Sequence, residues 1–172
     1  MLAYVFVLFA ILARLTGVTW GFTPLGASLL FFGAHRSRKQ LFFVLPALIA
    51  TDVILNRRYG FAIQPDQWVI WAWYAGAILF GSLLKDRIKP LYVIGAALTS
   101  ELSFFLITNF MVWFAWNSYP KTWQGLVACY VAGIPFFKNG LVSNLLFSAI
   151  FFSIPVLAAK FSSVMAKRHE TV

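Results

Sequence analysis

Residues 90–117 read PLYVIGAALTSELSFFLITNFMVWFAWN, and Glu101 is the only charged residue among them. As an α-helix at ~1.5 Å per residue this stretch would measure about 42 Å, whereas the hydrocarbon core of a bilayer is about 30 Å thick. The sequence therefore predicts a transmembrane helix that tilts, bends or protrudes from the membrane.

The rest of the chain is equally apolar. Of its 172 residues, 61% are hydrophobic and 11% are charged, and the mean hydropathy is +0.81, which excludes an ordinary soluble domain. Clusters of Pro, Gly and charge separate further apolar segments at residues 2–19, 23–34, 40–55, 67–84 and 141–159, with a shorter piece at 121–137. We predict an all-α integral membrane protein that forms a single membrane domain over residues 1–172. It is an irregular six-transmembrane-helix bundle with a short re-entrant or surface helix before the last span.

Two of these segments are unusual in length. Residues 23–34 would make about 18 Å of helix, which crosses a membrane only if its ends are buried against protein. Thr23 followed by Pro24 predicts where that helix begins. The apolar piece at 121–137 is too short to span and is followed by Lys138, Asn139 and Gly140. We therefore predict that it lies over a pocket as a lid.

The charge balance indicates an orientation. Fourteen Lys and Arg residues against five Asp and Glu give a net charge of +9. In a membrane protein such an excess is typical of loops retained in the cytoplasm, so we do not interpret it as nucleic-acid binding. Placing both termini in the cytoplasm puts most basic residues inside, including Arg36, Arg38, Lys39, Lys85, Arg87 and Lys89. We predict a multi-pass protein with cytoplasmic N- and C-termini.

Polar side chains within four spans fall at a similar depth in the outer half of this topology: Arg14, Asp52, Asn109 and Asn144. A charged side chain in a span costs at least ~2.5–3.5 kcal/mol on insertion scales, so it faces protein or a wet cavity and finds a partner. Arg14 and Asp52 have opposite charges, and we predict that they pair. The pair is either a structural ion pair or part of a ligand site.

The segment 90–117 also carries a polar and aromatic stripe at spacings of three and four: Glu101, Phe105, Thr108, Asn109, Val112, Trp113 and Trp116. Glu101 lies near mid-membrane. It is either a proton-coupling group or a hydrogen-bonded structural residue.

Aromatic side chains gather on the outer side. All seven tryptophans fall in the outer half: Trp20, Trp68, Trp71, Trp73, Trp113, Trp116 and Trp123. An ordinary interfacial belt populates both membrane surfaces, so this asymmetry predicts an outward-facing pocket with aromatic walls. We assign Trp20 and Trp68 to membrane anchoring, and Trp113, Trp116 and Trp123 to the walls, together with Tyr119 and Tyr130.

Small residues predict close helix contacts without saying which helices meet. The fourth segment has Ala72 and Gly76, then Ala77 and Gly81, each pair four residues apart. The second segment has Gly26 and Gly33.

No catalytic or metal-binding signature is found in the sequence. The single cysteine, Cys129, excludes an intrachain disulfide and a multi-cysteine metal site. The H-E-x-x-H, G-x-S-x-G and P-loop patterns are missing. An intramembrane enzyme that used Glu101 or Cys129 would need a second catalytic group, and none is evident. We predict no enzymatic activity, no metal and no cofactor.

Four stretches carry a family resemblance: FTPLGASLLFFGA, LPALIATDVILN, FFLITNFMVW and YPKTWQGLVACYVAGIPFFKNGLVSNLLF. In these the chain resembles an uncharacterised family of bacterial membrane proteins catalogued as transport proteins. That family is similar to the S components, the substrate-binding subunits, of energy-coupling-factor (ECF) vitamin transporters.

The resemblance implies six helices in the bacterial cytoplasmic (inner) membrane, a ligand pocket near the outer surface, and energising transmembrane and ATPase subunits as partners. It implies six family-motif positions: Asp52, Asn109, Trp113, Tyr119, Tyr130 and Asn144. One departure is that Ala10 is followed four residues later by Arg14, where S components often have a second alanine.

Two functions follow from these observations. The first is a membrane substrate-binding and transport protein that captures a small nutrient, a vitamin or its precursor. Asp52, Asn109 and Asn144 would make polar contacts with it, and Trp113, Trp116 and Tyr119 would stack on it. The alternative is a non-transporting membrane scaffold or interaction subunit. A scaffold should satisfy its polar groups internally, whereas a binder should leave a cavity beside them.

Overall fold

The computed structural model describes residues 1–17, 21–64 and 66–170, with the side chains of residues 164 and 166–170 left undescribed. Trp20, assigned to anchoring from the sequence, lies outside these residues. Within them the chain is all-α and contains no strand. The six helices are α1 (Leu2–Leu15), α2 (Leu25–His35), α3 (Leu41–Arg58), α4 (Gln67–Gly81), α5 (Pro90–Ala115) and α6 (Trp123–Glu170). Short 3-10 turns, Arg38–Gln40 and Ser82–Leu84, adjoin α3 and α4.

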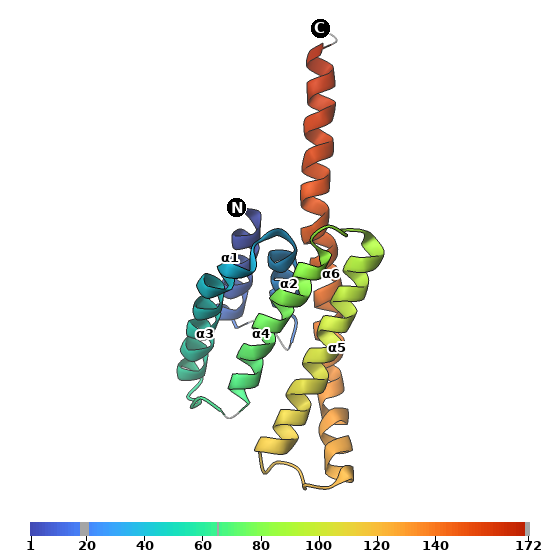
Figure 1. The fold of residues 1–172 in the computed structure, drawn as a ribbon. Helices are drawn as coiled ribbons and strands as arrows, with labels where there is room; N and C mark the ends of the chain where they lie inside the picture. The colour runs from blue at the N-terminus through green and yellow to red at the C-terminus, as the bar shows by residue number, and fades with distance from the viewer. Residues whose placement is uncertain (18–20, 65, 171–172) are drawn as a thin grey trace.

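The helices alternate in direction, and the N- and C-termini lie at the same end of the bundle (Figure 1). Four stretches are long and apolar enough to cross a membrane: Arg38–Arg58, Gln67–Leu84, Pro90–Ala115 and Trp123–Ser163. α1 and α2 are shorter apolar helices of 14 and 11 residues. The chain is therefore a multi-pass membrane protein by helix length and hydropathy.

Large apolar side chains face outward from several helices. Phe42 of α3, Leu91 of α5 and Phe161 of α6 are each more than 70% exposed. Exposed side chains of this size are suited to acyl chains, so the outer surface of the bundle contacts the lipid bilayer.

α2 is the centre of the packing. Its residues from Ala27 to Ala34 are all buried, so the other helices cover the backbone of this short apolar helix. The Leu25 N–H donates to Thr23 Oγ1 at 3.3 Å just before the helix begins. α2 crosses α4 at very close range, because a Cβ added to Gly33 would overlap the carbonyl oxygen of Ile78.

α6 corrects one prediction. The sequence predicted a short re-entrant or surface helix over 121–137 and a separate span over 141–159. The structure has one helix of 48 residues, about 72 Å long, which continues through Pro135, Lys138 and Gly140 and extends beyond the other helices at its C-terminal end (Figure 1). Water would satisfy the backbone groups of a broken helix in solution, but lipid does not, so the helix continues through residues that end helices elsewhere.

Candidate functional site

Asp52 is the centre of a buried polar cluster that joins three helices. Its side chain is 2% exposed and lies 2.5 Å from Arg14 Nη2 of α1. Three side chains of α4 donate to Asp52 Oδ2: Trp71 Nε1 at 2.9 Å, Gln67 Nε2 at 3.1 Å and the Tyr74 hydroxyl at 3.1 Å. Four donors surround the carboxylate, so its acceptor capacity is largely used inside the protein.

The sequence alone did not lead us to predict the α4 partners of Asp52. Gln67, Trp71 and Tyr74 are spaced by four and three, which places them on one face of a helix. That periodicity could have identified them as a donor face for an acidic residue. The cluster continues to the end of α3, where Asn56 Nδ2 donates to Gln67 Oε1 at 3.2 Å.

α5 and α6 form an antiparallel hairpin in which polar side chains of α5 face glycines of α6. A Cβ added to Gly140 would overlap Glu101 Oε1, and one added to Gly133 would overlap Asn109 Oδ1. The glycines therefore provide the space that these two side chains occupy.

One turn beyond Gly140, Asn144 ties the hairpin to α2. It is 1% exposed, and its Nδ2 donates to the Ala97 carbonyl of α5 at 3.0 Å. Its Oδ1 has no hydrogen-bond partner among the described residues and lies beside Gly26 of α2. Asn144 thus connects three helices.

A cavity of about 230 Å³ lies in this hairpin between Glu101 and Asn109. Phenylalanine rings from both helices, Thr108, Gly133 and Gly21 of the α1–α2 connection complete its lining. Four residues of the predicted stripe on α5 line the cavity: Glu101, Phe105, Thr108 and Asn109.

Most of the free polar groups of this cavity are acceptors. Glu101 is 9% exposed, and its carboxylate makes no hydrogen bond or ion pair with the described residues. The Thr108 hydroxyl donates to the Phe104 carbonyl at 2.7 Å, and Asn109 Nδ2 donates to the Phe105 carbonyl at 2.8 Å. The Thr108 hydroxyl proton and one N–H of Asn109 Nδ2 are therefore used by the backbone, while oxygen lone pairs and the second Asn109 N–H remain for a ligand.

The predicted aromatic walls lie elsewhere, at the end of the hairpin. Trp113 Nε1 donates to the Pro120 carbonyl at 2.9 Å, and Trp116 Nε1 donates to Asp66 Oδ1 at 3.1 Å. Lys121 Nζ donates to the carbonyls of Trp113 and Trp116. These hydrogen bonds of the two tryptophans stabilise the turn between α5 and α6 and connect it to the start of α4.

The other predicted residues are also separate from the cavity lining. Trp123 is 72% exposed, Tyr119 lies in the α5–α6 connection, and the Tyr130 hydroxyl donates to the Leu106 carbonyl at 2.8 Å. Of the eight residues predicted to bind substrate, all within the described ranges, Asn109 lines this cavity. Asp52 and Asn144 belong to two other contacts within the bundle.

Nothing in the described part of the chain resembles a metal centre. No group of three or more His, Cys, Asp or Glu side chains within those ranges comes together as ligands. The Cys129 thiol donates to the Asn109 carbonyl at 3.3 Å, so it is engaged in the hairpin contact.

Comparison with known proteins gives one match. The model of DUF6580, a family of unknown function, matches residues 1–166, and the chain belongs to that family. No curated protein and no solved structure matches the chain.

Proposed function

We propose that this member of the DUF6580 family is a membrane binding and transport protein that captures a small nutrient, a vitamin or its precursor, in the α5–α6 cavity. The observation that carries the proposal is the Glu101 carboxylate, which faces that cavity without a partner among the described residues. An ionisable group at mid-membrane is costly, and such groups mark ligand or proton pathways.

The chemistry of the cavity selects the ligand. Most of its free polar groups accept hydrogen bonds, so the ligand should be mainly a donor, and a carboxylate favours a donor with positive charge. Phenylalanine rings attract cations through their faces. A volume of about 230 Å³ is below the roughly 300–1,000 Å³ usual for drug-sized ligands, so the ligand should be compact. A single-ring amine satisfies all of these conditions.

The location of the cavity suits uptake. Gly21 in its lining belongs to the connection at the end of α1 away from the termini, and Glu101 lies midway along α5. With the termini in the cytoplasm, as the basic loops favour, the cavity lies in the outer half of the membrane. The protein would move the bound solute chemically unchanged, either by its own alternating closure or with energising transmembrane and ATPase subunits, as the similarity to S components suggests.

A membrane scaffold is the second candidate. It is favoured by the Asp52 cluster, in which Arg14, Gln67, Trp71 and Tyr74 satisfy the carboxylate within the protein. In the transport proposal this cluster only holds α1, α3 and α4 together, and the ligand binds at a separate site, in the cavity between α5 and α6.

Native mass spectrometry of the detergent-purified protein tests the proposal. Pyridoxamine and pyridoxine serve as probes, because they are single-ring compounds that differ in an amine against a hydroxyl. We expect a co-purified or added amine to bind the wild type and to be lost in Glu101→Gln and Asn109→Ala. The matched control is Asp86→Asn, which neutralises an exposed loop carboxylate. If no preparation carries a bound solute, and no vitamin or precursor raises thermal stability, the scaffold is the better reading.

A further inference from the structure

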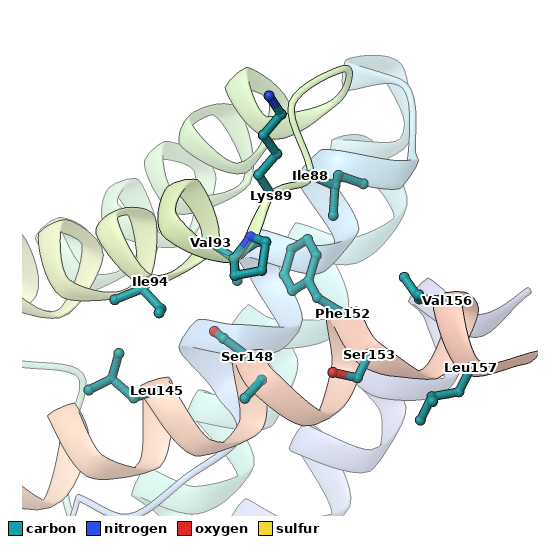
Figure 2. A pocket seen from close by; sticks show the side chains of 12 residues that line it. Ile88, Lys89, Val93, Ile94, Leu145, Ser148, Phe152, Ser153, Val156 and Leu157 are labelled. Carbon is teal, nitrogen blue, oxygen red and sulfur yellow. The ribbon is translucent and has the colours of Figure 1, made fainter. Parts of the chain in front are cut away.

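A second cavity, of about 440 Å³, lies between the start of α5 and the middle of α6. Figure 2 shows Val93 and Ile94 on one side of it, with Leu145, Phe152 and Leu157 of α6 on the other. This lining is largely apolar and matches the hydrocarbon part of an amphiphile. The cavity lies at the end of the bundle that carries both termini, far along α5 from Asn109.

The cavity also contains an unused polar group. Ser148 is 1% exposed, and its Oγ has no hydrogen-bond partner among the described residues. Figure 2 shows this hydroxyl directed into the space between the two helices. A buried hydroxyl without a partner is uncommon in proteins, so a ligand acceptor at this position would complete the site.

Basic residues gather at the end of the bundle where this cavity lies. Lys89 lies in its lining, and Figure 2 shows its ammonium directed away from Ser148 and Phe152. Lys85 and Arg87 belong to the same α4–α5 connection, and Arg38 and Lys39 belong to the α2–α3 connection at the same end of the bundle. Asp86 is the one acidic residue in these two connections.

The spacing of these groups matches a phospholipid. Because Asn144 contacts Ala97, one further turn along each helix places Ser148 beside Val93. Ser148 therefore lies about one helical turn, or roughly 5.4 Å, deeper than Lys89. A lipid whose phosphate lies at Lys89 would have its ester carbonyl near the Ser148 hydroxyl, and its chain would continue past Ile94 and Leu145.

We propose that this cavity binds one acyl chain of an anionic phospholipid, with Lys89 at the phosphate and Ser148 at the ester. Basic pockets between helices on the cytoplasmic side suit such lipids, which are the anionic component of that leaflet. The proposal is independent of the transport function, because it concerns a different cavity and a different ligand.

Native mass spectrometry of the full-length protein in nanodiscs tests this site. The discs contain equal amounts of phosphatidylglycerol and phosphatidylcholine with identical chains. We expect the wild type to retain phosphatidylglycerol, with Lys89→Gln reducing that preference about fivefold, as for one basic residue near a membrane surface. Lys39→Gln is the matched control, since Lys39 is exposed at the same end and lies outside the cavity lining.

Two further variants test whether the cavity holds the acyl chain of the lipid. Ala149→Trp places a large ring at the cavity lining, whereas Ala159→Trp places it on α6 away from that lining. Only Ala149→Trp should remove the retained lipid, and glycerol 1-phosphate, which lacks a chain, should not displace it. Equal lipid retention by these two variants, or equal preference in Lys89→Gln and Lys39→Gln, would overturn the proposal. A dimer that Ala149→Trp dissociates would instead assign the cavity to a second copy of the chain.

Discussion

Replacing Asp52 with asparagine should destabilise the bundle strongly. The change keeps an acceptor oxygen for the α4 donors but removes the charge that lies 2.5 Å from Arg14 Nη2. The Arg14 side chain is 18% exposed, so its guanidinium would remain mostly buried without a counter-charge. Removing one partner of a buried ion pair costs about 3–5 kcal/mol, and we expect a loss of that size in the free energy of unfolding.

Reversible unfolding in mixed micelles with increasing SDS measures this loss. The control is Asp66→Asn, because the Asp66 carboxylate accepts one hydrogen bond from the described residues, from Trp116 Nε1, and such a bond in a membrane protein contributes only about 0.6 kcal/mol. Adding Arg14→Gln to Asp52→Asn removes the stranded charge and should recover at least ~1 kcal/mol. If Asp52→Asn costs no more than Asp66→Asn, the cluster does not hold α1, α3 and α4 together.

Three further outcomes are expected. Gly33→Ala should destabilise the protein in the same SDS assay, because its Cβ would overlap a backbone carbonyl of α4, whereas Gly76→Ala, which meets open space, should be neutral or stabilising by up to ~1 kcal/mol. Spin labels at Trp123→Cys and Lys160→Cys, in a chain with Cys129 replaced by alanine, should lie about 55 Å apart if α6 is continuous. A much shorter distance would instead support the short re-entrant helix predicted from the sequence. In cells, an impermeant thiol reagent should reach position 123 from outside but not Lys39→Cys or position 160, and the opposite result would invert the proposed topology.

Much of the fold could be predicted from local properties of the sequence. A membrane offers no water to backbone groups, so each apolar stretch must satisfy its own hydrogen bonds as a helix. Length and composition therefore located α1 to α5, including the short α2. The common depth of Arg14 and Asp52 likewise followed from counting residues along two helices.

Gly33 of α2 and the course of α6 depend on contacts between helices, which local sequence rules do not describe. Pro135 and Gly140 indicate a break by the rules for water-soluble helices, yet α6 continues through both. Gly140 instead provides space for Glu101 across the hairpin. Gly33 and Gly76 look alike in the sequence, but only Gly33 lies at a helix crossing where a side chain would not fit.

The sequence by itself determined that the chain is a helical membrane protein and which polar side chains lie within its apolar helices. Only the tertiary structure decided which of them meet: Asp52 with α4, Asn144 with Ala97, and Glu101 with an open cavity. The physical reason is that depth depends on position along one helix, whereas contact depends on the rotation and register of two helices, which are decided by packing across the whole bundle.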